Sequence, residues 1–561
     1  MISKQRSSEN RSIWLGCFAL LTALALIPIW LFPYVPTQDG PAHLDAAATL
    51  LELSRGSALF GTFFEAQWQL GTNQLYHALL VLLGSAMPLL LAEKLLLSLY
   101  VLCMPLAVLF ALRGLRGANR SAVFLVFPAI CPFVFYLGFY NFCAGLVFFS
   151  FTLGVYLRLA RAEAPGQRVA LTAALALSFA LCYAAHIISA ANALLVLGVM
   201  ASVALLNRRP NAGLSALLVV AAALPTVLFV LTFFLRQPVR EDGTTQFLSV
   251  GDLVAAFFVQ VPDLPYKLYS SLVVHTWLDA LFLAPWHLLL VGLAGLAIYG
   301  CMEGRRVPHP ELLAALGLVL FITLWTPNRL GEIGFLTDRF LPYTYVLLTL
   351  WLSTVAFSPH IWRVAAVAGV VCAAALLLYR IPVHAALNVN VREFASAHVA
   401  AEREGTVLPL ILVKDNNAYP PPGLVLPNMR YSEMLHAVGY IALLRPVVTL
   451  NDYQAAKGYF PLRYEAAKSP ITHLSEDGLR GLERPPFAFD IGAYRDRTGA
   501  EVDYVFLWGD LEEVEGRSDV QAILAQLEAY DLIYTSAQRS LMRVYARDAL
   551  NLGAERSESR P

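Results

Sequence analysis

The first two thirds of the chain consist of long apolar runs separated by short polar segments. A helix needs about 20 apolar residues to cross a bilayer, and windowed hydropathy identifies such helices. The windows predict about eleven membrane spans. The predicted spans are residues 12–32, 91–112, 121–135, 141–157, 169–186, 190–206, 214–234, 280–299, 312–325, 340–357 and 364–379.

Basic residues fall in alternate connecting segments. Because cytoplasmic loops carry an excess of Lys and Arg, the side that holds these residues is predicted to be cytoplasmic. The basic N-terminus joins this side, and no small-x-small cleavage site follows the first apolar run, so residues 12–32 are predicted to be a retained span. The opposite side receives Asp39, residues 236–277 and 326–339, and everything after Arg380. The cytoplasmic side holds Lys4, Arg6, Arg11, Arg113, Arg116, Arg120, Arg158, Arg161, Arg168, Arg208, Arg209, Arg305, Arg306, His360 and Arg363.

Residues 74–90 are also apolar enough to span the membrane. If they did, every later basic loop would be inverted. They are therefore predicted to form an interfacial or re-entrant helix on the outer side. With a further helix predicted over residues 43–54, the first outer loop holds two helices.

After residue 380 the chain becomes more polar. Residues 407–413 and 502–508 have the pattern of strands, and residues 479–483 and 520–530 have the pattern of helices. The expected fold is therefore a polytopic α-helical membrane domain (1–380) followed by a soluble α/β domain (381–561). The topology places this second domain outside the cytoplasm. Arg outnumbers Lys, and the outer parts contain no N-glycosylation sequon, which suits a bacterial inner membrane with a periplasmic C-terminal domain.

The composition agrees with a membrane protein and excludes some partners. Hydrophobic residues make up 58% of the chain and charged residues 14%, whereas soluble domains contain about 25% charged residues. The net charge is zero and no basic patch suits nucleic acid. All seven cysteines lie in or beside apolar segments, so neither a disulfide framework nor a Cys-type zinc site is expected in the C-terminal domain.

Asp39 stands directly after the first span, in the stretch TQDGPAHLD that begins at Thr37. A carboxylate at the mouth of a span is costly to keep unless something uses it. It could act as a general base that takes the proton of an acceptor hydroxyl. The alternative is a helix N-cap, since Gly40 and Pro41 follow and an apolar-periodic helix comes next.

His43 follows Asp39 by four residues, so the two side chains are predicted to face the same way. They could hold a metal ion together, or His43 could orient Asp39, although two ligands alone do not make a metal site. The alternative is a histidine that is satisfied at the interface.

Cations and aromatic residues gather on the predicted outer side. Arg339 begins a span there, where positive-inside bias does not explain it, and Arg suits bidentate contact with phosphate. The alternative is a snorkelling anchor paired with Asp338. Residues 236–277 offer cations beside aromatic rings, which suits an anionic headgroup and a sugar face, or else an aromatic belt with solvated charges. The candidate substrate-binding residues are His43, Tyr140, Asn141, His186, Arg240, Lys267 and Arg339.

Four features together resemble the GT-C glycosyltransferases, membrane enzymes that use polyprenyl-phosphate sugars, such as the protein O-mannosyltransferases and the lipid A aminoarabinose transferases. They are the outer Asp39 after the first span, the amphipathic segment LLELSRG (50–56), the segment LYHALL (75–80) and the late outer motif DRFLP (338–342). The resemblance covers the membrane part of the chain, up to residue 380.

The resemblance implies a catalytic Asp at Asp39 and a basic residue in contact with the donor phosphate at Arg339. It also implies that a sugar is moved from a polyprenyl-phosphate donor to an extracytoplasmic glycan, lipid or protein, with the C-terminal domain tied to acceptor recognition. Members often carry a second acid beside the first. Gly40 stands there in this chain, so dependence on a divalent cation is left open and no cofactor is assigned.

Two other function classes remain open. A transporter or lipid flippase predicts ionisable residues in mid-span and broken helices in corresponding halves, whereas the charges here gather at one face. A non-catalytic GT-C-like subunit of an envelope-polysaccharide assembly complex would keep the fold without the chemistry.

Overall fold

The computed structural model describes residues 2–69, 71–235, 263–329, 334–413, 419 and 429–547, with side chains described from residue 11 onward. The chain divides into two compact units. The first comprises Met1–Leu31, Leu70–Tyr76 and Leu97–Ile381, and the second comprises Phe32–Gln69, His77–Leu96 and Pro382–Pro561. The expected domain boundary after residue 380 lies beside the last change of unit, and two earlier segments also belong to the second unit.

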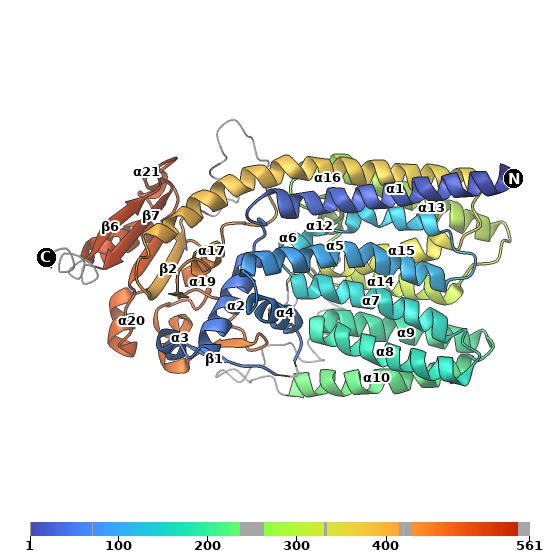
Figure 1. Cartoon of the computed structure of the whole chain (residues 1–561), viewed down its shortest axis with the longest axis horizontal. Coiled ribbons are helices and arrows are strands. Elements are labelled where there is room, and N and C mark those ends of the chain that lie inside the picture. The colour runs from blue at the N-terminus through green and yellow to red at the C-terminus, as the bar shows by residue number, and fades with distance from the viewer. Residues whose placement is uncertain are drawn as a thin grey trace. The chain divides into compact units, whose positions relative to one another are not determined.

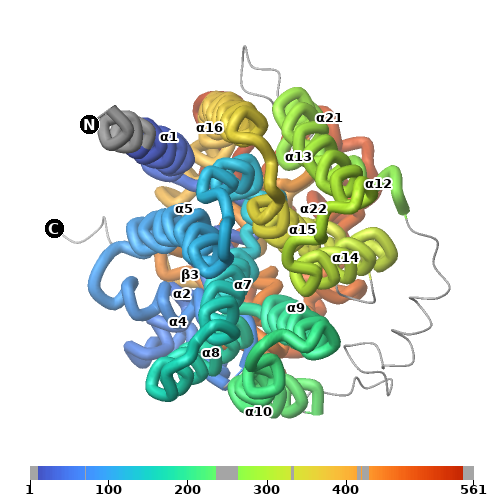
Figure 2. The backbone as a smooth tube through the Cα atoms, turned by 90° about the vertical axis from the view of Figure 1, so that its right-hand side faces the viewer, coloured from blue at the N-terminus to red at the C-terminus, as the bar shows by residue number. Residues whose placement is uncertain are grey.

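The first unit is built from helices that run side by side (Figure 1) and are seen end-on in Figure 2. Helix α7 packs on α8 and α9, α10 packs on the same two helices, and α14 packs on α9 and α15. The helices are α1 (Ile2–Leu31), the later part of α5 (Leu89–Gly114), α6 (Phe133–Tyr136), α7 (Tyr140–Leu159), α8 (Pro165–Ala185), α9 (Ile187–Leu206), α10 (Ala212–Leu235), α12 (Leu264–Leu272), α13 (Ala280–Met302), α14 (Pro310–Trp325), α15 (Leu336–Ser353) and the first part of α16 (Pro359–Ala395).

Eight helices within the described ranges are long and apolar enough to cross a membrane. They correspond to the predicted spans in α1, α5, α7, α8, α9, α10, α13 and α16. The predicted spans 312–325 and 340–357 are also helical, as α14 and α15. The chain is therefore a multi-pass membrane protein.

The predicted span over residues 121–135 is not a single helix, and that expectation was wrong. The segment is broken into the 3-10 turns η1 (Arg120–Leu125) and η2 (Phe127–Ala129) and the short helix α6. Pro128 and Pro132 explain the breaks, because proline lacks an N–H and keeps the preceding residue out of the helical region. Most of the segment is buried, and irregular backbone at membrane depth is tolerated where protein covers it.

The apolar segment 74–90 forms the ten-residue helix α4 (Leu75–Gly84), which is separate from α5. At 1.5 Å per residue α4 is roughly 15 Å long, about half of what a bilayer crossing requires. This length supports the interfacial or re-entrant reading. The other predicted helix of this region, over residues 43–54, is present as α2 (Gly40–Ser54).

The second unit contains a five-stranded mixed sheet with the order β3-β2-β5-β7-β6. Strand β2 pairs in parallel with β3 and β5, and β7 pairs antiparallel with β5 and β6. The predicted strands 407–413 and 502–508 are confirmed as β2 and β5, which are direct neighbours. The strands are β2 (Gly405–Ile411), β3 (Val447–Thr449), β5 (Tyr504–Trp508), β6 (Tyr530–Thr535) and β7 (Met542–Arg547).

Short helices accompany this sheet. The predicted helix 479–483 is α19, and the predicted helix 520–530 is α22, which ends before residue 530 because β6 begins there. The helices are α17 (Val438–Ala442), α18 (Pro470–His473), α19 (Arg480–Glu483), α20 (Ile491–Thr498), α21 (Leu511–Val514) and α22 (Ser518–Gln526).

Early and late parts of the chain share the core of the second unit. Strand β1 (Phe64–Ala66) pairs antiparallel with β4 (Leu462–Tyr464). Buried side chains of α2 and of α3 (Ala58–Phe63) belong to one apolar cluster with side chains of the sheet. Burial of this apolar surface holds α2, and with it Asp39, on the C-terminal part of the chain.

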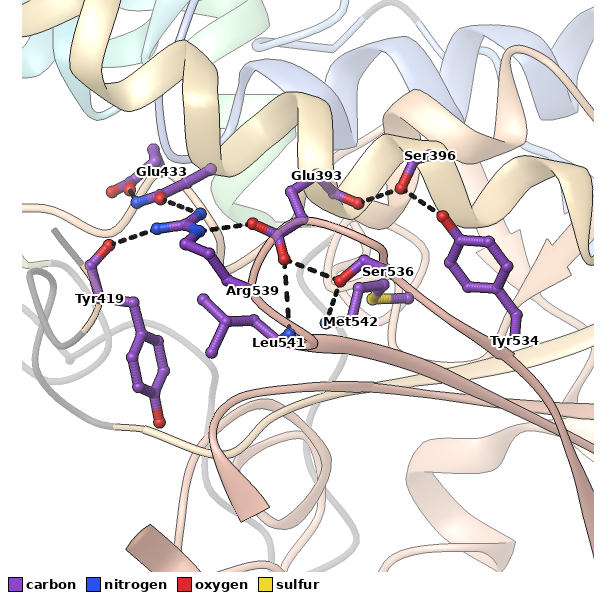
Figure 3. Close-up of polar contacts among 10 residues, drawn as sticks. Glu393, Ser396, Tyr419, Glu433, Tyr534, Ser536, Arg539, Leu541 and Met542 are labelled. Atoms are coloured by element: carbon purple, nitrogen blue, oxygen red, sulfur yellow. Dashed lines mark hydrogen bonds and ion pairs between the residues drawn. The ribbon is translucent and has the colours of Figure 1, made fainter. Parts of the chain in front are cut away.

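The C-terminal end of α16 is fastened to the loop between β6 and β7 by a buried ion pair (Figure 3). Arg539 Nε donates to Glu393 Oε2 over 2.6 Å, and Ser536 Oγ donates to Glu393 Oε1 over 2.7 Å. The other nitrogens of Arg539 donate to the Asn390 side chain and to the Tyr419 carbonyl. The Glu393 side chain is 1% exposed. These buried bonds therefore hold the end of α16 against the loop between β6 and β7.

Candidate functional site

Asp39 occupies the N-cap position of α2, as the sequence pattern predicts, and Pro41 stands in the first turn. Its side chain makes no capping hydrogen bond. The capping interpretation therefore fits the position of Asp39 and not the direction of its carboxylate.

The carboxylate of Asp39 is buried, with 5% of the residue exposed. Tyr453 Oη donates to its Oδ2 over 3.1 Å, and Gln38 Nε2 donates to its Oδ1 over 3.0 Å. His436 Nε2 lies 3.6 Å from Oδ1. Burial, and then the nearby charge of Arg484, lowers the pKa of His436 to about 3, so this imidazole is neutral near pH 7.

Gln454 connects His43 to this carboxylate. Its Nε2 donates to His43 Nδ1 over 2.8 Å and to Tyr453 Oη over 3.2 Å, and Tyr453 in turn donates to Asp39. Its Oε1 lies 2.7 Å from His77 Nε2, which is also 3.1 Å from His43 Nδ1. One proton assignment satisfies all these contacts: His77 carries its proton on Nε2, and His43 Nδ1 accepts.

Gln454 and Tyr453 thus link His43 to Asp39, and the expected contact of His43 with substrate stays a prediction. Within the described ranges, no group of three or more His, Cys, Asp or Glu side chains could hold a metal ion.

The second unit holds three further carboxyl groups, those of Asp45, Asp452 and Glu483. Burial raises the pKa of Asp45, and the neighbouring Asp452 raises it further. Burial likewise raises the pKa of Asp452. It raises the pKa of Glu483 to about 8, against the charge of Arg484 and with a contribution from Asp39. Burial thus favours the neutral forms of these three groups, whereas Asp39 accepts hydrogen bonds from Tyr453 and Gln38, and bonds of this kind favour a charged carboxylate.

A second set of predicted residues meets in the first unit. Arg339 lies in the first turn of α15, with its guanidinium 4.6 Å from the centre of the Phe139 ring. Its Nη1 is 3.3 Å from His186 Nε2. His186 is the N-cap residue of α9, and its Nδ1 faces the Ile188 N–H. Because a guanidinium can only donate, His186 Nε2 is the acceptor in its contact with Arg339.

Other predicted residues have structural partners. Lys267 Nζ donates to the carbonyls of Thr323, Leu324 and Thr326 and so caps the C-terminal end of α14. These three bonds use all three protons of an ammonium group.

Asn141 accepts from the Tyr76 N–H and donates to the Asn73 carbonyl. The Tyr140 ring packs on Tyr76. Both residues thus hold the segment that precedes α4. Arg240 lies outside the described residues.

The residues that the sequence reasoning missed are Gln38, His436, Tyr453 and Gln454. One signal was available, because Asn451, Asp452, Tyr453 and Gln454 form a polar run directly after the apolar strand β3. Such a run at the end of a buried strand is a common place for functional side chains.

No family model matches the chain, and no curated protein matches it. Ten chains of solved structures do, among them two of ArnT. ArnT from Cupriavidus metallidurans bound to undecaprenyl phosphate has a TM-score of 0.51, 11% sequence identity, and coverage of 95% of this chain and 98% of that one. The apo state of the same protein has a TM-score of 0.53 with the same identity and coverage. The chain therefore has the fold of ArnT, and the predicted resemblance to the lipid A aminoarabinose transferases is confirmed at the level of the fold.

Proposed function

We propose that this chain is a membrane glycosyltransferase that moves a sugar from a polyprenyl-phosphate-linked donor to an extracytoplasmic acceptor. Asp39 acts as the general base, and Arg339 contacts the donor phosphate. The setting of Asp39 carries the proposal. This buried carboxylate stands at a helix N-terminus without capping it, and it receives hydrogen bonds from Tyr453 and Gln38. A buried charge costs stability, so its retention favours a chemical role.

The chemistry follows from the weak nucleophilicity of an acceptor hydroxyl. Asp39 takes the hydroxyl proton while the acceptor oxygen bonds to the anomeric carbon of the sugar. The bond between that carbon and the phosphate oxygen breaks, and the polyprenyl phosphate leaves with the electron pair. Tyr453 and Gln38 fix the carboxylate in one orientation, which lowers the entropic cost of reaching the reactive geometry.

The departing phosphate needs hydrogen-bond donors. Arg339 offers a guanidinium fork, and its contact with His186 orients that fork. Lys267 is engaged by three carbonyls, which favours Arg339 over Lys267 as the phosphate contact. Likeness of fold to a protein crystallised with undecaprenyl phosphate supports a lipid phosphate as the donor class.

Replacing Asp39 by Asn tests the proposal. Asn keeps the shape, can accept from Tyr453, and is itself a good N-cap, so the expected result is normal folding with a transfer rate lowered about 10²–10⁴-fold. The assay follows the release of undecaprenyl phosphate from synthetic undecaprenyl-phosphate sugars. The purified full chain is supplied with bacterial envelope glycolipids as acceptors.

Asp45→Asn is the matched control. Asp45 lies on the same helix and is buried, and burial and the neighbouring Asp452 raise its pKa. A neutral amide therefore suits its surroundings, and transfer is expected to continue. An Asp39→Asn protein that transfers sugar at the wild-type rate would exclude Asp39 as the base. A wild-type protein that binds the donor but never releases undecaprenyl phosphate would favour the non-catalytic subunit. Donor exchange between leaflets without cleavage would favour the flippase.

A further inference from the structure

A cavity of about 400 Å³ lies in the first unit, among the ends of α7, α9, α10 and α14. Pockets for small ligands typically measure about 300–1,000 Å³. Cationic, aromatic and apolar side chains line it together, among them Arg116, Arg161, Arg209, Tyr156, Met200 and Glu311.

The buried acid in this cavity already has its partners. Arg209 Nη2 donates to Glu311 Oε2 over 2.9 Å, and His309 Nδ1 lies 3.0 Å from Glu311 Oε1. The negative charge of Glu311 is therefore balanced within the wall of the cavity.

The other two arginines have no such balance. Arg161 Nη1 donates to the Gly114 carbonyl over 2.7 Å, which orients the guanidinium. Arg161 and Arg116 are both exposed, and among the described residues neither forms an ion pair, although Glu163 also lines the cavity. Two solvent-accessible guanidiniums thus border the cavity.

The cavity is separate from the surroundings of Arg339. Helix α7 begins beside Phe139, on whose ring Arg339 lies, and ends where Leu157 and Ala160 line the cavity. Helix α9 likewise begins at His186 and reaches the cavity near its other end. A helix of 20 residues is roughly 30 Å long, the thickness of a hydrocarbon core. The two places therefore lie at opposite ends of the same helices, at the levels of opposite leaflets.

We propose that this cavity is a binding site for a phosphate monoester or diester group, held by Arg116 and Arg161. Guanidinium groups bind phosphate oxygens through paired hydrogen bonds. Basic pockets between membrane helices are suited to anionic lipid headgroups. The apolar wall at Met200, Ala201 and Leu157 suits the glycerol and first methylenes of a lipid, while a soluble phosphate would use the arginines alone. The site does not depend on the glycosyltransferase activity.

The test measures binding to the purified full chain in a non-ionic detergent. The probes are dihexanoyl phosphatidic acid, dihexanoyl phosphatidylcholine and inorganic phosphate, followed by native mass spectrometry. Phosphatidic acid is expected to bind at least about tenfold more tightly than phosphatidylcholine, whose choline cancels the phosphate charge. The double variant Arg116→Gln/Arg161→Gln is expected to bind it about 30-fold more weakly, from the worth of two arginines near an anionic lipid.

Arg168→Gln is the matched control. Arg168 also donates to a backbone carbonyl, that of Ala162, but it does not line the cavity. Its loss is expected to change the affinity less than twofold. Equal weakening by Arg168→Gln, or no preference for phosphatidic acid in the wild-type protein, would overturn the proposal. Displacement of the lipid by inorganic phosphate at a similar concentration supports the site and identifies a soluble phosphate as its ligand, whereas retention of the lipid identifies a headgroup.

A second measurement uses only the wild-type protein, so it tests the proposal even if the double variant does not fold. The wild-type protein is treated with phenylglyoxal, which modifies arginine, and the modified positions are mapped by peptide mass spectrometry. Phosphatidic acid is expected to protect Arg161 and to leave Arg168 reactive. Equal reactivity of Arg161 with and without the lipid would show that the cavity does not bind it.

Discussion

Gly439 of α17 lies close to the backbone of Pro41 on α2. Pro41 follows Asp39 by two residues. A Cβ at position 439 would lie 2.0 Å from the Pro41 carbonyl oxygen and 2.6 Å from its carbon. Real Cβ atoms essentially never come within 3.0 Å of such atoms, so in Gly439→Ala the two backbones must separate by about 1 Å. Both partners are backbone atoms, and no rotation of a side chain can relieve this contact.

The displacement is expected to reach Asp39. The Tyr440 hydroxyl of α17 donates to the Val35 carbonyl, and His436, just before α17, lies 3.6 Å from Asp39 Oδ1. Any shift between α17 and α2 therefore changes the surroundings of the carboxylate. Overpacking of this kind costs roughly 1–3 kcal/mol of stability, and a misplacement of about 1 Å can lower a reaction rate about 10²-fold.

The assay compares thermal unfolding with the release of undecaprenyl phosphate for Gly439→Ala and for Gly516→Ala. A Cβ on Gly516 meets open space, so this control carries the same loss of freedom in the unfolded chain without the clash. The transfer rate of Gly439→Ala is expected to fall by more than the fraction of unfolded protein at the assay temperature can explain. The reasoning is refuted if Gly439→Ala loses stability but keeps wild-type transfer well below its unfolding temperature, because the position of Asp39 would then not limit the reaction.

Three further predictions follow from buried charges. Arg339→Ala should weaken donor binding, which raises the donor concentration needed for half-maximal transfer, and should slow transfer, while Arg339→Lys should recover only part of either. Unchanged donor kinetics would make Arg339 an interfacial anchor. Glu393→Gln or Arg539→Met alone should cost roughly 3–5 kcal/mol and the double variant less than their sum, as a double-mutant cycle of unfolding will measure. Because the pKa of Glu483 is raised from 4.5 to about 8, the folded protein binds the extra proton. Stability should therefore fall as the pH rises from about 5 to about 8, and Glu483→Gln should flatten this fall in thermal scans.

The sequence predicts those parts of the fold that depend on local pattern. Runs of apolar residues locate the long helices, and the polar stretch after the first run locates Asp39. The alternation of basic loops predicts that residues 74–90 do not cross the membrane, which agrees with the break between α4 and α5. Where averaging over a window hides a local breaker, as Pro128 and Pro132 do, the pattern predicts a helix that does not form.

The partners of these residues lie beyond local pattern. Tyr453 donates to Asp39 across 414 positions of sequence, and no periodicity indicates that the loop after β3 meets the start of α2. For Lys267, local sequence suggests a partner that differs from the one in the structure. Its neighbours in sequence suggest a sugar or phosphate contact, while its actual partners are carbonyls 56 to 59 positions away.

The choice among the acidic residues of the second unit therefore depends on their partners. Asp39 and Asp45 lie on the same stretch of sequence, in TQDGPAHLD. In the folded chain, Asp45 is buried near Asp452, and two carboxyl groups that share a site cannot both ionise easily. Asp39 instead receives donors from Tyr453 and Gln38. Environments that differ in this way between neighbouring carboxyl groups can separate acid and base roles, and here the difference supports the proposal of Asp39 as the base.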